Sequence, residues 1–290
     1  MKEIDVSIII VNYNTLQMTR ECIDSIFTKT KGVNFEIILV DNASTDGSQN
    51  YFKGDKRILF IQSNKNLGFG RANNLGAKYS KGKYLFLLNS DTLLVNNAIK
   101  IFYDQMEALS QKIAFIGAPL LCKDCKAIGH SYYYFPSLKT FFFDVFYYYT
   151  RIKLNKEPKQ YVGNYKVDYV TGADLFCRNY LIKKHGLFDE DFFMYFEEVE
   201  LQYRYSKMGY ESMIVEGPKI IHLSGASFNS KKETLHKKRL MIFRSRFLFM
   251  KKCYGGWRYA TFKLLSLFYL PSFRDYSKEQ KREYLSFFRI

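Results

Sequence analysis

Residues 6–11 read Val-Ser-Ile-Ile-Ile-Val, a run rich in β-branched side chains that is typical of a strand buried on both faces of a parallel sheet. Outward from this run, further buried strands are expected at 35–40, 58–61 and 84–88, and helices at 16–27, from Ser44 onward and at 68–79. Strands and helices that alternate at this interval predict right-handed crossovers and an α/β fold with a doubly wound, mostly parallel sheet. Ligands bind such sheets beyond the carboxyl ends of the strands, where Asp41 and Asp91 fall.

The chain has 290 residues, enough for one large α/β domain with a modest appendage. We expect the domain at residues 1–230 and a helical, basic and aromatic extension at 231–290. Lys and Arg number 44 against 28 Asp and Glu, a formal net charge of +16. This excess favours an anionic partner, which could be nucleic acid, an acidic lipid surface or a phosphorylated substrate.

The pattern changes beyond about residue 119. A loop-rich aromatic region is expected at 132–149, followed by a strand at 167–177 and a helix at 198–208. Predicted short strands lie at 213–215 and 220–223, and predicted helices near 237–252, 257–270 and 277–288. No apolar run approaches the ~20 clean residues of a membrane-spanning helix, so a protein that does not span the membrane is expected. Five cysteines in a chain too large to need disulfides predict reduced thiols in the cytoplasm.

The segment Asn89-Ser90-Asp91 follows the strand expected at 84–88. A carboxylate in this position can hold Mg²⁺ or Mn²⁺, hard cations that prefer oxygen ligands and bridge to phosphate oxygens. The alternative is a plain turn, because Asn, Ser and Asp side chains satisfy local backbone groups in turns. The triplet alone favours the turn.

Three other positions carry groups suited to a site. Glu197-Glu198-Val199-Glu200 opens a predicted helix after an aromatic run, so one carboxylate could act as a general base whose pKa an apolar pocket raises. Alternatively, these acids stabilise the N-terminus of the helix electrostatically. Asp41 could accept a hydrogen bond from a nucleobase imide. His222 ends an apolar strand, where a lone histidine is more often structural than a ligand.

Taken together and in order, these segments resemble the GT-A family of inverting glycosyltransferases, particularly its bacterial rhamnosyltransferase-like branch. The resemblance runs from Val6 to about Ser227 and is carried by residues 6–46, 64–76, 87–92, 170–189, 193–210 and 222–227. It implies a Rossmann-like GT-A catalytic domain that moves a sugar from a nucleoside-diphosphate sugar to a saccharide or lipid-linked saccharide acceptor. Bacterial surface polysaccharide synthesis is the implied pathway.

The resemblance also implies roles for single residues. Asp91 and His222 would bind Mg²⁺ or Mn²⁺, with Asn89 in place of the first aspartate of the family's DxD motif. Glu198 would be the catalytic base beside Glu197, where the family commonly has an aspartate. The residues implied to bind the donor, from the nucleobase pocket through the diphosphate to the sugar, are Val11, Asn12, Tyr13, Asp41, Arg71, Asn89, Ser90, Asp91, Gly172 and Ala173.

Asn89 and Glu198 differ from the aspartates common at these positions in the family. These differences leave a noncatalytic nucleotide-sugar or glycan-binding protein as the alternative. Nucleic acid is not an expected partner, because the sequence has no zinc-finger, RNP or helix-turn-helix signature.

The predicted helix at 237–252 places four apolar side chains on one face between basic residues, namely Leu240, Phe243, Phe247 and Met250. One interpretation is a helix that lies in the interface of an anionic membrane and attaches the protein peripherally to its inner face. The other is a helix packed against the catalytic domain with a solvated basic edge.

Overall fold

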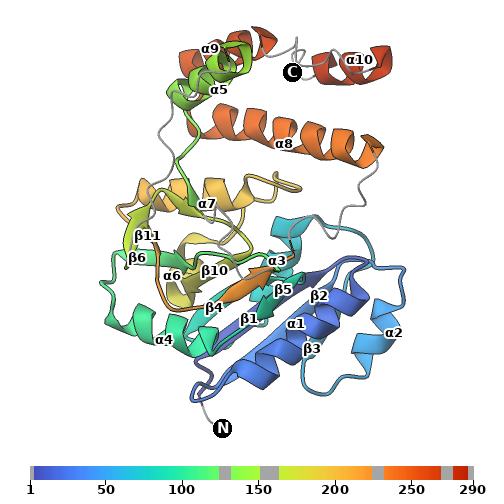
Figure 1. Ribbon diagram of the computed structural model, residues 1–290, viewed down its shortest axis with the longest axis vertical. Coiled ribbons are helices and arrows are strands. Elements are labelled where there is room, and N and C mark those ends of the chain that lie inside the picture. Colours follow the sequence, from blue (N-terminus) through green and yellow to red (C-terminus); the bar gives the residue numbers. More distant parts are fainter. Residues whose placement is uncertain (1–2, 124–131, 151–162, 224–231, 269–276, 287–290) are drawn as a thin grey trace. The chain divides into compact units, whose positions relative to one another are not determined.

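The computed structural model describes residues 3–123, 132–150, 163–223, 232–268 and 277–286 (Figure 1). These residues form two compact units. The first comprises the described residues up to 134 and residues 163–223, and the second comprises residues 135–150 and the described residues from 232 onward. The second unit therefore includes an internal segment that the sequence analysis assigned to the 1–230 domain.

The first unit is built on an eight-stranded sheet. β1 pairs in parallel with β2 and with β4, and β10 runs antiparallel between β4 and β6. The sheet is thus mixed but mostly parallel in its first half, as expected. In spatial order its strands are β3 (Leu59–Gln62), β2 (Phe35–Asp41), β1 (Val6–Asn12), β4 (Tyr84–Asn89), β10 (Asp174–Arg178), β6 (Ile113–Gly117), β11 (Glu211–Ile214) and β8 (Tyr165–Val167).

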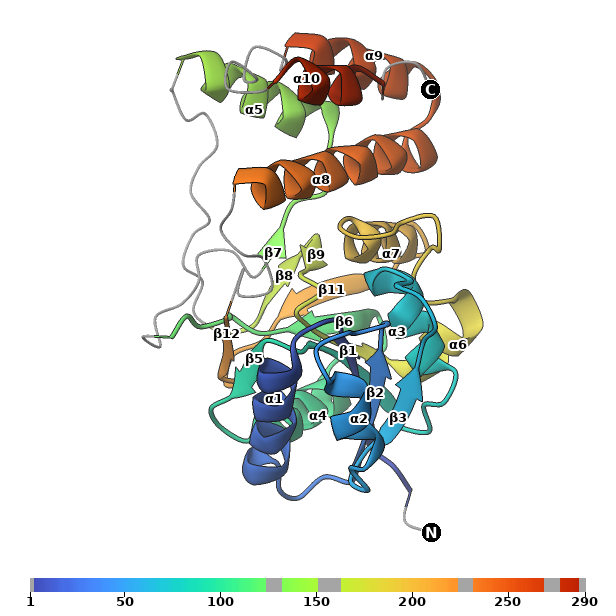
Figure 2. The same cartoon turned by 90° about the vertical axis from the view of Figure 1, so that its right-hand side faces the viewer.

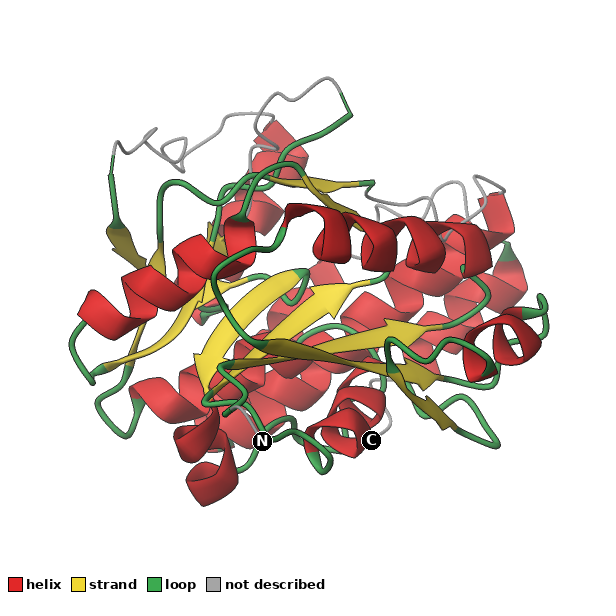
Figure 3. Cartoon of the chain, turned by 90° about the horizontal axis from the view of Figure 1, so that it is seen from below, coloured by secondary structure: helices red, strands yellow, loops and turns green. Residues whose placement is uncertain are grey.

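Helices cover both faces of this sheet, which explains the unbroken apolar run of β1 (Figure 3). Ile8 and Ile10 point into one core with α1 (Leu16–Lys29), α2 (Ser48–Lys53) and α4 (Ala98–Ala108). Ile9 points into a second core with α3 (Phe69–Ala77), α6 (Asn179–His185) and α7 (Glu197–Ser206). Successive strand residues face opposite sides, so a strand between two cores needs apolar residues at every position.

In the first unit, a predicted strand and a predicted helix differ in the structure. The strand expected at 167–177 is divided into β8, β9 (Tyr169–Val170) and β10, because the chain bends at Asp168 and turns again at 171–173. The helix expected from Ser44 begins only at Ser48, directly after Gly47, whose φ of 89° is left-handed. Two small sheets complete the unit: β5 (Thr92–Leu94) pairs with β12 (Ile220–His222), and β7 (Tyr132–Tyr133) pairs with β9.

The second unit consists of four helices in its described part: α5 (Leu138–Thr150), α8 (Lys232–Cys253), α9 (Gly256–Phe268) and α10 (Lys278–Ser286). The expectation of a loop-rich region at 132–149 was wrong for α5, whose Phe141 ring packs 4.7 Å from that of Phe262. Packing of this kind can outweigh the weak helix propensity of aromatic residues. Figure 2 shows α5, α9 and α10 on the same side of α8.

The apolar face of α8 is covered. Leu240, Phe247 and Met250 are buried, and the ring of Phe247 packs 4.9 Å from that of Phe262 on α9. Phe243 lies 4.2 Å from the ring of Tyr284 on α10. This face is therefore not available to lie in a membrane interface. In the described part of the chain, every helix is too short or too polar to cross a bilayer.

We predict that Gly76→Ala destabilises the fold. Gly76 lies in α3, and a Cβ there would be 2.7 Å from Ile9 Cγ2 and 3.1 Å from Val40 Cγ2. Overpacking of this kind costs about 1–3 kcal/mol and outweighs the roughly 1 kcal/mol gain in helix propensity, so a lower free energy of unfolding is expected in urea titrations. Gly54→Ala is the matched control, because its nearest neighbour would be 3.8 Å away. Equal stability of the two variants would contradict the close approach of α3 to the sheet.

Candidate active site

Asn12, the last residue of β1, has a completely buried side chain that joins three segments. Its Nδ2 donates to Asp41 Oδ1 at 2.8 Å and to Ser44 Oγ at 3.0 Å. Its Oδ1 accepts from the hydroxyls of Thr15 and Thr19, each at 2.8 Å. These four bonds use the full capacity of the amide. Asn12 therefore organises the loops around it with its whole side-chain amide, and a part for it in the nucleobase pocket stays a prediction.

Asp41 plays a similar part at the end of β2. Its side chain is buried, and its second oxygen, Oδ2, accepts from the backbone N–H of Ser44 at 3.0 Å. Asp41 thus holds the loop after β2 in place, while direct contact between Asp41 and a nucleobase stays a prediction. Of the residues predicted around the base, Tyr13 is 47% exposed and Val11 is partly exposed, so these two can touch a ligand.

The same network reaches the Asn89-Ser90-Asp91 segment. The hydroxyl of Thr15 lies 3.1 Å from that of Ser90. Asp91 Oδ1 in turn lies 3.2 Å from His222 Nε2, and Asn89 Nδ2 lies 3.4 Å from the same nitrogen. These side chains lie close together because β5 pairs with β12, which places Thr92 opposite His222 (Figure 2). The structure therefore brings Asn89, Asp91 and His222 together across the chain.

Asp91 and His222 offer one carboxylate and one imidazole nitrogen to a cation. Both side chains are largely buried, with 9% and 18% of their surface exposed. Among the described residues there is no group of three or more His, Cys, Asp and Glu side chains arranged to hold a metal. Two protein ligands still suit Mg²⁺ or Mn²⁺, because such ions are commonly held by one or two side chains and completed by substrate phosphates and water.

A strained turn presents the two glutamates at the start of α7. Tyr195 and Phe196 both have left-handed backbone angles, with φ of 68° and 70°. Such angles are uncommon for bulky residues and are retained where the surroundings enforce them, often at functional sites. Here the backbone N–H of Phe69 donates to the carbonyl oxygen of Phe193 at 2.9 Å. A Cβ at Gly68 would overlap that carbonyl, so only glycine permits this contact.

The surroundings of Glu197 and Glu198 favour their protonated forms. Glu197 is buried next to Gly70. Glu198 packs against Gly172, and a Cβ added to Gly172 would lie 3.7 Å from Glu198 Cβ. Burial raises the pKa of Glu198 to about 7, against the opposing effect of nearby backbone N–H groups. Burial, and then the charge of Glu198, raise the pKa of Glu197 well above its usual range. The Oε2 atom of each is shielded from solvent and has no hydrogen-bond partner in the structure as described.

Gln202, one turn after Glu198, is a positioning residue that the sequence analysis missed. Its Oε1 accepts from the backbone N–H of Val170 and its Nε2 donates to the carbonyl of Val170, both at 2.8 Å. The same Nε2 donates to the carbonyl of Glu198 at 3.0 Å. These bonds fix the start of α7 to the strand that leads into Gly172 and Ala173. A polar residue four positions after the expected base was the one available signal.

Gly172 and Ala173 connect the two halves of the site. Gly172 lies against Glu198, and the carbonyl of Ala173 accepts from the backbone N–H of Asn89 at 3.0 Å. Asn89 in turn contacts His222. A continuous series of contacts therefore runs from the predicted base to the predicted metal ligands.

Arg71 is placed differently. It is exposed on α3, and its Nε donates to the carbonyl of Glu190 at 2.7 Å. This bond holds the chain just before the strained turn. Contact between Arg71 and the donor diphosphate stays a prediction.

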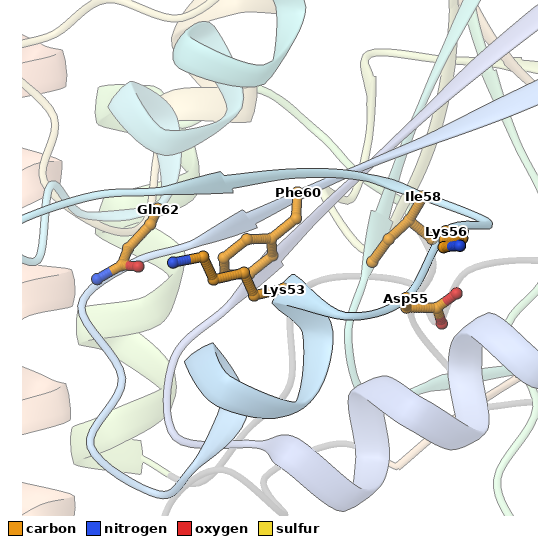
Figure 4. Close-up of a pocket in the computed structure, with 6 residues that line it drawn as sticks. All are labelled: Lys53, Asp55, Lys56, Ile58, Phe60 and Gln62. Carbon is orange, nitrogen blue, oxygen red and sulfur yellow. The ribbon is translucent and has the colours of Figure 1, made fainter.

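A hollow of about 430 Å³ lies at the edge of the sheet between α2 and β3 (Figure 4). It contains none of the predicted site residues. The residues that line it are Lys53, Asp55, Lys56, Ile58, Phe60 and Gln62.

Comparisons with known proteins identify the family. Residues 7–183 match the model of glycosyl transferase family 2, and the chain belongs to this family. It is 32% identical to glycosyltransferase GlyG of Streptococcus pneumoniae serotype 4 over 106 residues, and the aligned residues make up 35% of each chain. It is 28% identical over 205 residues to the low-salt glycan biosynthesis hexosyltransferase Agl10 of Haloferax volcanii, covering 69% of this chain and 61% of Agl10. The chain thus spans less than two thirds of either relative.

Solved structures show the same fold. The crystal structure of GalNAc-T7 with UDP, GalNAc and Mn²⁺ superimposes with a TM-score of 0.58 at 14% identity, covering 91% of this chain and 54% of that one. The predicted fold class, a GT-A α/β domain with a mostly parallel sheet followed by C-terminal helices, is confirmed.

We predict that Asp174→Asn removes a pH dependence of stability. Asp174 follows Ala173, and its buried Oδ2 accepts from the N–H of Ala118 at 2.7 Å, while its shielded Oδ1 has no partner in the described chain. Burial raises the pKa of Asp174 well above its usual range. The folded protein keeps a proton that the unfolded chain releases above about pH 4, so wild-type stability should fall as pH rises. The amide of the variant cannot ionise, so the variant should lack this dependence.

Urea unfolding of both proteins between about pH 5 and 8 measures this effect as the difference in free energy of unfolding. Asp104→Asn, which changes an exposed carboxylate, is the control. A wild-type-minus-variant difference that stays constant across this range would show that Asp174 is ionised in the folded state.

Proposed function

We propose that the chain is an inverting, metal-dependent glycosyltransferase that moves a hexosyl group from a nucleoside-diphosphate sugar to a hydroxyl of a saccharide or lipid-linked saccharide. The observation that carries the proposal is the carboxyl group of Glu198. Its pKa is raised to about 7, and contacts through Gly172 and Ala173 link it to Asn89, which lies beside His222. Membership of glycosyl transferase family 2 and similarity to a hexosyltransferase support the reaction class.

The donor would bind at the carboxyl ends of β1, β2 and β4. Tyr13 and Val11 offer exposed surface for the base, while the buried Asn12 and Asp41 hold the loops in place. Asp91 and His222 would hold a divalent cation, which supplies positive charge to the departing diphosphate. A solved structure of similar fold that contains UDP and Mn²⁺ supports this assignment.

The transfer is a single displacement. The acceptor hydroxyl loses its proton to the carboxylate of Glu198 as its oxygen attacks the anomeric carbon. The bond from that carbon to the diphosphate oxygen breaks on the opposite face, so the configuration inverts and the nucleoside diphosphate leaves with the electron pair. A base with a pKa near 7 is suited to this step, because it is partly ionised at neutral pH and still binds a proton well. Glu197, buried alongside, contributes to the apolar surroundings while it stays protonated.

Donor and pathway are the finer parts of the proposal. Similarity to the rhamnosyltransferase-like branch favours a deoxyhexose donor, and a role in bacterial surface polysaccharide synthesis would place the acceptor at the inner face of the membrane. A thermal-shift screen with Mn²⁺ and a panel of nucleotide sugars, including thymidine-diphosphate rhamnose, would identify the donor for the experiments below.

We predict that Glu198→Gln lowers the transfer rate by about 10²-fold or more and leaves donor affinity near wild type, because it removes the base and keeps the shape of the side chain. In the wild-type protein the rate should fall as pH drops through about 7, where Glu198 takes up a proton. Release of nucleoside diphosphate measures the rate, and calorimetry measures affinity.

Glu190→Gln, which changes an exposed glutamate in the segment before α7, is the control and should transfer normally. Near-normal turnover in Glu198→Gln would exclude Glu198 as the base. A wild-type protein that binds the donor but never releases nucleoside diphosphate would instead indicate the noncatalytic binding protein. The presence of Asn89 and Glu198 in place of the family's aspartates allows this alternative.

We predict that Asp91→Ala weakens Mn²⁺-dependent donor binding by about tenfold or more, since it removes one of two protein ligands. Calorimetry with the donor found in the screen, with and without Mn²⁺, measures the effect. Asp104→Ala should bind like wild type, because Asp104 is exposed on α4. An Asp91→Ala protein whose affinity still depends on Mn²⁺ as in wild type would disprove the metal assignment.

A further inference from the structure

Helix α9 of the second unit has two different apolar faces. One face is buried in its own unit: Phe262 and Ser266 are fully covered, and Phe262 packs against Phe141 of α5 and Phe247 of α8. The other face is exposed and carries four residues at helical spacing: Trp257, Ala260, Leu264 and Leu267. We refer to these four as the α9 apolar stripe.

The exposure of this stripe is unusual for large apolar side chains. Trp257 is 69% exposed, Leu264 59% and Leu267 40%. Positions 257, 260, 264 and 267 repeat every three or four residues, so they project from one side of the helix. A continuous exposed row of this kind typically marks an interaction surface, whereas single exposed apolar residues do not.

The charge around the stripe indicates what covers it. Residues 231–290 contain 16 Lys and Arg against 4 Asp and Glu, whereas the other 230 residues contain 28 against 24. Most of the net positive charge of the chain therefore lies in this segment. Arg258 is exposed next to Trp257, and Lys251 and Lys252 are exposed at the end of α8, just before α9.

We propose that the α9 apolar stripe inserts into the interfacial region of an anionic lipid bilayer, with the surrounding cations on the headgroups. Tryptophan favours this region, because its ring is apolar and its N–H is polar. Anionic headgroups attract clustered Lys and Arg, and a basic helix with one apolar face lies in the plane of the interface. A protein partner for the stripe would not by itself call for so large a positive excess.

This surface differs from the α8 face considered from the sequence, which is buried. Binding to lipid does not depend on the transfer reaction. Only its consequence, that the acceptor is presented at a membrane, rests on the proposed function.

The chain contains one tryptophan, so its fluorescence reports directly on the stripe. The full chain is titrated with vesicles of phosphatidylglycerol and phosphatidylcholine, and with vesicles of phosphatidylcholine alone. We expect a shift of the emission to shorter wavelength and quenching by brominated lipid with the anionic vesicles. Both effects should weaken with added salt, because the cations contribute to binding.

The test variant is Leu264→Ser combined with Leu267→Ser, which keeps Trp257 and should weaken vesicle affinity by about fivefold or more. Leu59→Ser is the matched control, because Leu59 is 42% exposed on β3 and should bind like wild type. Glu198→Gln should also bind vesicles normally, and the double variant should keep donor affinity in solution. These two results separate failure of lipid binding from failure of the active site.

Three results would overturn the proposal. One is the absence of a spectral shift with anionic vesicles. Another is an equal loss of affinity in the double variant and in Leu59→Ser. The third is a concentration-dependent self-association that the double variant abolishes while lipid binding persists, which would assign the stripe to a second copy of the chain.

Discussion

The four hydrogen bonds of the Asn12 amide fix the geometry on which the rest of the site depends. They join the end of β1 to Asp41 at the end of β2, to Ser44 in the following loop and to Thr15 and Thr19 at the start of α1. A buried amide that lost any partner would cost about 1–3 kcal/mol, so these segments are held in one arrangement. Because Thr15 also contacts Ser90, the arrangement extends to the segment that carries Asp91.

This constraint divides the polar residues into two groups. Asn12, Asp41 and Gln202 are buried with their hydrogen bonds directed to the protein, and they position loops. Tyr13 is exposed and Glu198 is partly accessible, and the Oε2 atom of Glu198 has no partner among the residues described. Residues of the first group would tolerate substitution poorly whatever the ligand, while those of the second can act on it.

The sequence predicted what depends on local pattern. The apolar run of β1 identified a strand between two cores. Polar residues after β4 and at the start of α7 indicated the two places where the candidate site is proposed. It could not predict what depends on contacts between distant segments. The role of Gln202 depends mainly on Val170, which lies far away in the sequence, so its polar side chain four positions after Glu198 was only a weak local signal. Helix α5 contains aromatic residues with weak helix propensity, and the packing of Phe141 on Phe262 helps to explain it.

Burial explains how a glutamate can serve as the proposed base where the family commonly has an aspartate. The proton affinity of residue 198 is set by its surroundings: the strained turn at Tyr195 and Phe196, which places the group at the start of α7, and the packing against Gly172. Burial then raises the pKa to about 7 in a carboxyl group whose ordinary value is near 4.3. The raised pKa that the proposed base requires therefore follows from burial at the start of α7, and either acidic residue can supply the carboxyl group.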